Sequence, residues 1–398
     1  MERNGLTRRR VKRLITFTCT LLVLLTGCSK PETDIEITSS DGSTAVSEPI
    51  SELNITERVV DLSPISGAFQ TAAQTAIRST VAQCQEMKSK IFNFISNPNE
   101  QTQTSAQASY NSCHQNWAKS AFYFTEAFNL NESQGLKRMV DLIDTRPYLA
   151  GYIDGIPEYP YSGLIHELEL PINLDTLRGQ HRLMDEDSAS LGFPVIEFFL
   201  WKGPLNEHWQ AQSDEDAQNL INRRQTYLKV ATEHLIEQLL KAQYRWRDNG
   251  EFNQLPDRAK FNVELKTLQR FTMAELLNRI FKDSTLVEPE WVHPAQFAGN
   301  GRIYLLNQLE ELSVLLGTVE TPTPLSEWLG NEEGLGVNAQ ELQQALAASI
   351  EAASKLPANF PFETEAGEQW NMARQQIAKL ALGITQVSQH LKLNVVTQ

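Results

Sequence analysis

The chain has 398 residues and a formal net charge of −14, with 41% hydrophobic and 21% charged residues. The acidic balance argues against nucleic acid as a partner, because proteins that bind nucleic acid present a basic face. Since single hydrophobic cores stop growing at about 250–300 residues, a chain of this length is expected to fold as more than one unit.

The first 27 residues have the pattern of a secretory signal. Basic residues from Arg8 to Arg13 precede a short apolar stretch, Ile15–Leu25, which is too short to remain in a bilayer as a spanning helix. The sequence then reads Leu-Thr-Gly-Cys, which is similar to a bacterial lipobox, so we expect cleavage before Cys28 and lipidation of that cysteine. Two acyl chains would hold the protein at a membrane surface, and Ser29 favours the outer membrane. The alternative is a soluble secreted protein in which Cys28 is incidental.

The mature chain is expected to begin with a tether. Residues 28–54 are rich in Ser, Thr, Glu, Asp and Pro and have little to bury, which is typical of a flexible acidic linker. Residues 1–27 carry six basic side chains and one acidic side chain, so their removal changes the net charge to −19. Such a charge favours solubility and attracts cations.

Residues 56–133 are expected to form a helical hairpin. Apolar residues recur at helical spacing on either side of the turn signal Ser96–Asn99. In an antiparallel hairpin, residues equidistant from the turn face each other, and Cys84 and Cys113 are so placed, on the two apolar stripes. Because disulfides form in extracytoplasmic compartments, we predict a Cys84–Cys113 bridge. The second arm is expected to continue to Phe128, with one carboxylate among aromatic residues.

Residues 134–212 interrupt the helical pattern with six prolines and seven glycines. So long an irregular segment inside a compact domain is usually functional or disordered, and its aromatic residues favour order. Within it, Glu197 stands alone in an apolar and aromatic run, Leu191–Gly203. A buried carboxylate needs a cation, a metal or hydrogen-bond donors. Glu197 is therefore a ligand, a catalytic group or one half of a buried network, and we interpret the segment as a folded insertion that brings it to a site.

Helical periodicity returns after the insertion, and strand alternation is absent from the sequence. We therefore predict an all-α fold made of two helical bundles, residues 55–250 with the insertion 134–212, and residues 251–398. The expected later helices lie at 220–246, 257–283, 299–317, 338–356 and 365–392.

Four stretches resemble the imelysin family of bacterial envelope proteins. Gly192 and Glu197 match the GxHxxE motif of the family, but Pro194 occupies the histidine position. Three further stretches are similar to family segments: Trp117–Phe128, Arg146–Asp154 and Arg223–Leu228. The resemblance implies the same two-bundle architecture. It also implies two kinds of activity, an iron-linked binding protein and a metallopeptidase.

The candidate metal ligands are Glu197, His166, Glu126 and Asp154. His166 and Glu169 have a spacing that would place both on one helix face, as do His234 and Glu237, although two such pairs are close to chance expectation. The zincin motif HExxH is absent from the sequence. We expect His234 to be a half-exposed structural residue, and a solvated helix face remains the alternative for Glu126. An oxygen-rich site would favour ferric iron, calcium or manganese over zinc.

Pro194 decides between the two activities. Hydrolysis needs a metal with about three protein ligands and an open position, and proline removes the nitrogen ligand of the motif. Proline is tolerated in the first helical turn, so Pro194 can begin the helix that carries Glu197. We therefore expect a non-peptidase that binds a metal ion or small ligand and is linked to iron acquisition. The alternatives are a metallopeptidase of the imelysin type and a polysaccharide-binding or structural envelope protein.

Overall fold

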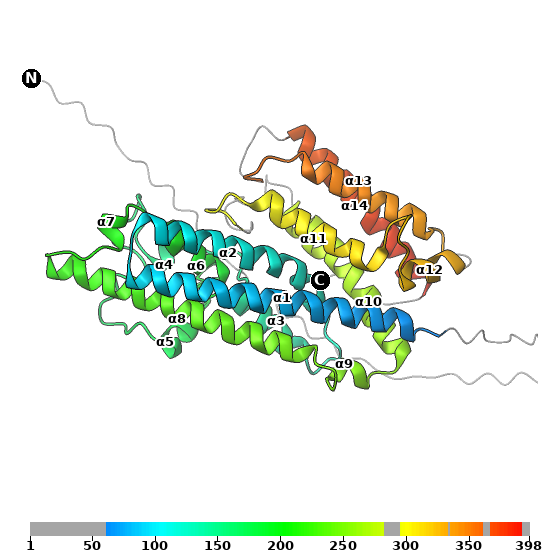
Figure 1. Ribbon diagram of the computed structural model, residues 1–398, viewed down its shortest axis with the longest axis horizontal. Coiled ribbons are helices and arrows are strands. Elements are labelled where there is room, and N and C mark those ends of the chain that lie inside the picture. Colours follow the sequence, from blue (N-terminus) through cyan, green and yellow to red (C-terminus); the bar gives the residue numbers. More distant parts are fainter. Residues whose placement is uncertain (1–60, 282–294, 333–334, 361–366, 392–398) are drawn as a thin grey trace, which may run out of the picture. The chain divides into compact units, whose positions relative to one another are not determined.

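The computed structural model describes residues 61–281, 295–332, 335–360 and 367–391. Within these ranges there are fourteen α-helices, one 3₁₀-helix and one π-helix, and no strands (Figure 1). The all-α prediction is thereby confirmed. The signal, the tether and Cys28 lie outside the described residues. Val59–Gln398 form one compact unit by their contacts, and the division into two bundles near residue 250 stays a prediction.

A disulfide-linked hairpin packs against a third long helix. Helices α1 (Ser63–Ser96) and α2 (Glu100–Ala121) run side by side with α8 (Glu215–Arg245) along α1 (Figure 1). The side chain of Asn99 accepts a hydrogen bond from the Thr102 N–H, and the Thr102 hydroxyl accepts one from the Asn99 N–H. This capping box begins α2 at the predicted turn.

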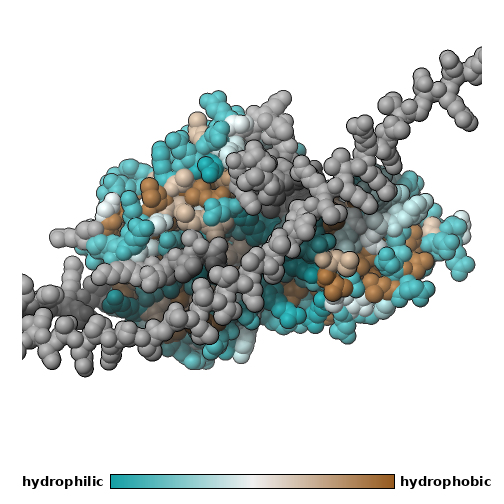
Figure 2. Space-filling view, turned by 180° about the vertical axis from the view of Figure 1, so that it is seen from behind, coloured by the Kyte–Doolittle hydropathy of each residue, from teal (hydrophilic) through white to brown (hydrophobic). Residues whose placement is uncertain are grey.

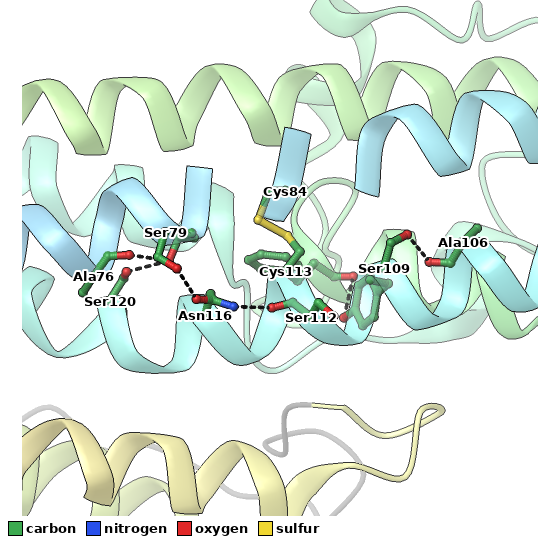
Figure 3. Close-up of a disulfide and its surroundings, with 12 residues drawn as sticks. Ala76, Ser79, Cys84, Ala106, Ser109, Ser112, Cys113, Asn116 and Ser120 are labelled. Carbon is green, nitrogen blue, oxygen red and sulfur yellow. Dashed lines mark hydrogen bonds between the residues drawn. A yellow bond between two sulfur atoms is a disulfide. The ribbon is translucent and has the colours of Figure 1, made fainter. Parts of the chain in front are cut away.

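The predicted Cys84–Cys113 disulfide is confirmed. It joins α1 to α2 with a Cα–Cα distance of 4.6 Å, and both cysteines are fully buried (Figure 3). Thr80 and Ser120 share a buried hydrogen bond of 2.7 Å between the same two helices. A disulfide of this kind indicates an oxidising, extracytoplasmic compartment.

The second arm of the hairpin is shorter than predicted. Helix α2 ends at Ala121 and continues as a 3₁₀ turn, Phe122–Phe124, instead of reaching Phe128. All three aromatic residues of that turn are buried. One face of an α-helix cannot bury three consecutive side chains, so the chain tightens here and directs them into the core.

Residues 134–212 contain more helix than their composition suggested. Five short helices occupy the region: α3 (Ser133–Ile143), α4 (Ala150–Ile153), α5 (Leu174–Gln180), α6 (Phe193–Trp201) and α7 (Leu205–His208). The sequence hid α6 because its first eight residues are all buried, so it has no polar face to produce an amphipathic period. Gly192, which begins α6, has φ +96°, and a Cβ there would lie 2.9 Å from the Ile143 carbonyl oxygen.

The remaining helices follow the predicted order. They are α9 (Glu251–Gln254), α10 (Asp257–Arg270), the π-helix η2 (Phe271–Ile280), α11 (Gly301–Leu316), α12 (Pro324–Asn331), α13 (Ala339–Ser354) and α14 (Gly367–His390). The helices expected within 257–283, 299–317, 338–356 and 365–392 are confirmed, whereas α9 and α12 were not expected. Helix α13 packs on α11 and α14, and α11 packs against α2, which brings the C-terminal half onto the hairpin.

Apolar side chains are largely turned inward. On the face in Figure 2, hydrophobic residues form separate areas within a mostly hydrophilic surface. Among the helices of the described residues, none combines the length and the apolar character needed to cross a membrane.

Candidate functional site

Seven polar and aromatic side chains from distant parts of the sequence meet inside the fold. They come from α2, the end of α3, α6, η2 and α11, and we call them the central cluster: His114, Trp117, Asp144, Arg146, Glu197, Glu275 and Tyr304. Six of these residues are less than 9% exposed. Glu275, on the π-helix, retains 17% exposure of its side chain.

Asp144 is the centre of the cluster, and its two oxygens differ. Oδ2 accepts hydrogen bonds from Arg146 at 2.5 Å, Trp117 at 3.0 Å and Tyr304 at 3.0 Å. Burial opposes the charge of this carboxylate, but the positive charge of Arg146 outweighs that effect and holds the pKa of Asp144 well below its usual range. Asp144 is therefore ionised at neutral pH.

The other oxygen of Asp144 faces a histidine. His114 Nε2 lies 3.9 Å from Asp144 Oδ1, and neither buried atom has a hydrogen-bond partner among the described residues. Burial lowers the pKa of His114, so its imidazole is neutral at pH 7. The ring packs between Phe193 and Tyr304, each at 4.7 Å between centroids. Two unpaired polar atoms at this separation leave an acceptor and a nitrogen free to share a ligand.

The π-helix η2 supplies the outer charges of the cluster. Arg146 Nη1 lies 3.5 Å from Glu275 Oε1, and Arg279 Nη1 lies 3.2 Å from Glu275 Oε2. The charges thus alternate from Asp144 through Arg146 and Glu275 to Arg279. π-helical turns are rare and occur frequently at functional sites.

Glu197 is buried as predicted and is met by backbone donors. Its Oε1 accepts the Ala298 N–H at 2.8 Å, and the N–H groups of Phe297 and Gln296 also face the carboxyl group. Burial nevertheless raises the pKa of Glu197 to about 8, and the negative charge of Asp144 adds to the shift. Glu197 is thus mostly protonated at neutral pH and occupies a buried network next to the central aspartate.

Pro194 lies in the first turn of α6, as predicted from the tolerance of proline there. Its neighbour Phe193 contacts the ring of His114. A histidine from α2 therefore contacts the residue that precedes the motif position occupied by proline. Sequence reasoning missed His114, because nothing in the spacing of α2 distinguishes it from other residues on the buried stripe.

Asp154 and His166 come together in a second buried group. Asp154 is fully buried and contacts Arg224 at 2.6 Å, His166 at 3.2 Å and Lys202 at 3.3 Å. Despite burial, His166 and Arg224 hold the pKa of Asp154 far below its usual range. This group fastens the insertion to α8, where Arg223 also donates to the carbonyl groups of four insertion residues, Leu164, Ile165, Glu167 and Leu170.

Two predictions about histidines were wrong, one on spacing and one on exposure. His166 and Glu169 lie in turns, so their spacing puts them on no common helix face. His234 does lie on α8, but it is 1% exposed instead of half-exposed. Its Nε2 accepts from Arg178 at 3.3 Å and lies 3.0 Å from the amide nitrogen of Gln238.

Glu126 follows the 3₁₀ turn and pairs with Arg270 at 2.8 Å, with 12% exposure of its side chain. It is therefore neither on a solvated helix face nor in the central cluster. The structure thus distributes the four predicted ligands over three places: Glu197 in the central cluster, Asp154 with His166, and Glu126 with Arg270. Among the described residues, no three His, Cys, Asp or Glu side chains are arranged to hold a metal ion.

Comparisons with known proteins agree with the family resemblance of the sequence. Residues 73–283, more than half of the chain, match the family model described as imelysin. The chain belongs to the imelysin family. Comparison with curated protein sequences gave no match.

Two solved structures share the fold of this imelysin-family chain. An imelysin-like protein from Psychrobacter arcticum 273-4 aligns with a TM-score of 0.57 and 15% identity, covering 85% of this chain and 98% of the other. A protein described as an iron-regulated protein A precursor, from Parabacteroides distasonis ATCC 8503, aligns with a TM-score of 0.58 and 12% identity, covering 83% and 95%. At this identity the likeness establishes the fold alone.

Proposed function

We propose that this imelysin-family protein is a non-peptidase that binds a metal ion or small polar ligand in the central cluster. The observation that carries the proposal is a pair of atoms without a hydrogen-bond partner among the described residues, His114 Nε2 and Asp144 Oδ1, in a site closed to polypeptide. The Parabacteroides relative is described as an iron-regulated protein, and this description supports a link to iron acquisition.

The donor atoms fit a cation in part. His114 is a neutral imidazole and Asp144 an ionised carboxylate, which are the protonation states that metal ligation requires. These two residues would hold the ion, and Glu197 lies near enough for Asp144 to raise its pKa. A mixed nitrogen and oxygen set suits iron, manganese or zinc. The bound ion would supply positive charge to a polar ligand.

Peptidase chemistry is less well supported. A hydrolytic metal needs about three protein ligands and one open position that the scissile bond can reach. Pro194 offers no donor, and Glu197 already accepts hydrogen bonds from the backbone. Both His114 and Asp144 are less than 5% exposed, so an extended polypeptide has no route to them in this conformation.

We further infer that the mature protein is attached to the cell envelope through Cys28 and faces the periplasm from the outer membrane. The disulfide supports an oxidising compartment. The lipobox-like sequence that ends at Cys28 supports the anchor. The membrane surface would then be one partner of the chain and the metal ion or ligand another.

Calorimetric titration of metal-free protein with Mn²⁺, Zn²⁺ and ferric citrate tests the proposal. We expect His114→Gln to weaken binding of the preferred ion by about tenfold or more, because one of two strong donors is lost. Glu197→Gln should weaken it less, because Glu197 lies near the two ligands but is held by backbone N–H groups. His166→Gln should leave the affinity unchanged, because His166 belongs to the Asp154 group. Pro194→His should raise affinity for Zn²⁺ by restoring a nitrogen ligand.

His234→Gln is the matched control, since His234 is an equally buried histidine outside the cluster. Circular dichroism should show that all variants remain folded. If wild type binds none of these ions, or if His114→Gln and Glu197→Gln bind as wild type does, the central cluster is not the metal site.

A further inference from the structure

A basic pocket lies apart from the central cluster, where α3, α5 and α8 meet. It consists of two adjoining hollows of about 440 and 220 Å³ that share Arg138, Leu142 and Arg178. We call them together the α3–α8 pocket. Volumes of this size are typical of sites for small ligands.

Positive charge is in excess in this pocket. Its basic side chains are Arg138 on α3, Arg178 and Arg182 on and after α5, and Lys241 on α8. Among the described residues, two acids pair with them. Asp141 holds Arg182 through three contacts of 2.6 to 3.1 Å, and Glu237 lies 2.7 Å from Lys241 and 3.4 Å from Arg178. His234 adds no charge, because burial lowers its pKa to about 4.

Two positive charges therefore remain uncompensated on a chain whose net charge is −14. Arg138 is exposed and, among the residues that the structure describes, has no acidic partner. Arg178 is held in place from the side by His234 at 3.3 Å. Lys241 and Glu237 form an exposed i,i+4 pair, which is weak and easily exchanged for a ligand.

Apolar side chains in the walls of the pocket favour a ligand that also has an apolar part. Met139 and Leu142 line the pocket beside the basic groups. Gly135 leaves the α3 side of the pocket open, since a Cβ there would meet nothing within 4 Å.

We propose that the α3–α8 pocket binds a small phosphate monoester with a compact apolar body. Guanidinium groups recognise phosphate oxygens with paired hydrogen bonds, and a dianion matches the two surplus charges.

Titration of the full mature protein with phenyl phosphate tests this assignment. We expect Arg138→Gln and Arg178→Gln each to weaken binding by about tenfold, as loss of a charge-assisted contact predicts. Gly135→Leu keeps every charge but fills the pocket, and it should abolish binding. Because leucine favours a helix more than glycine does, this variant should fold at least as well as wild type. Inorganic phosphate should bind about fivefold more weakly than phenyl phosphate, since it lacks the apolar body.

Two matched controls lie on α1. Arg78→Gln removes another exposed arginine, and Gly67→Leu fills open space at another exposed helical glycine, so both should bind phenyl phosphate as wild type does. Absence of binding at about 10 mM phenyl phosphate, or unchanged binding in the Arg138, Arg178 and Gly135 variants, would overturn the proposal. Equal affinity for inorganic phosphate would overturn the assignment of the apolar body.

Discussion

Replacement of Arg146 by methionine is expected to lower the free energy of unfolding by about 3–5 kcal/mol, the usual effect of breaking a buried ion pair from one side. Arg146 and Asp144 lie 2.5 Å apart, with 3% exposure of each side chain. Trp117 and Tyr304 would still donate to Asp144, but neither brings a positive charge. The carboxylate would then remain charged in a buried site without a cation, or its pKa would rise until it takes up a proton. Denaturation by urea at neutral pH, with the disulfide intact, measures the change.

The double variant Asp144→Asn/Arg146→Met should recover most of the loss, since it leaves no unpaired charge. Arg78→Met is the matched control because Arg78 is exposed on α1, and its effect should stay within about 0.5 kcal/mol. A free energy of unfolding for Arg146→Met within about 1 kcal/mol of wild type would be close to an ordinary surface effect. Arg146 would then not stabilise Asp144 as the geometry indicates.

The second large effect is a pH dependence of stability that Glu197 introduces. The pKa of Glu197 is raised from 4.5 to about 8 in the folded protein. Its contribution to stability is therefore complete below about pH 4.5 and is lost as the pH rises through about 8. At about 1.4 kcal/mol per pKa unit, the loss amounts to about 4–5 kcal/mol. Among the described residues, the largest effects on Glu197 besides burial come from Asp144 and from the N–H groups of Gln296, Phe297 and Ala298, and of these Asp144 is the charged group.

Glu197→Gln should remove this dependence. Urea denaturation of metal-free protein at about pH 5, 7 and 9 should show wild type losing several kcal/mol more than the variant across the series. The difference between the two proteins cancels contributions from other buried acids, such as Glu264, whose pKa burial also raises. Glu158→Gln, at an exposed position, should follow wild type. Parallel curves for wild type and Glu197→Gln would show that Glu197 is ionised at neutral pH in the folded protein.

Local pattern predicted the hairpin and its disulfide. Cys84 and Cys113 lie at equal distances from a turn, and each lies on the apolar stripe of its helix. These two features predicted their pairing, which the structure confirms. The long helices after residue 212 were also predicted, because each has one polar face, whereas the short helices α9 and α12 were not. Helix α6 was not predicted, because a helix that is buried on every side shows no periodic change between polar and apolar residues.

The central cluster could be predicted only in part. Glu197 was conspicuous because it is a lone charge in an apolar run. His114, Asp144 and Tyr304 belong to three elements separated by up to 190 residues, and their meeting depends on how α11 packs against α2. The sequence Asp144-Thr-Arg146-Pro147 places two opposite charges beside a proline. This pattern points to a buried ion pair only when both side chains are known to be buried, as they are in the structure. The spacing of His166 and Glu169 failed because it presumed a helix where the chain makes turns.

The most direct test of the proposed non-peptidase role is a cleavage assay on an unfolded protein substrate. Purified mature protein is incubated with labelled, denatured casein, with added Zn²⁺ or Mn²⁺ and with a chelator, beside Glu197→Gln and His114→Gln. We expect no cleavage above the background of the buffer in any of these samples, because the central cluster is closed to polypeptide and lacks the motif nitrogen at Pro194. Cleavage that the chelator stops and that Glu197→Gln abolishes would contradict the binding role and establish a metallopeptidase.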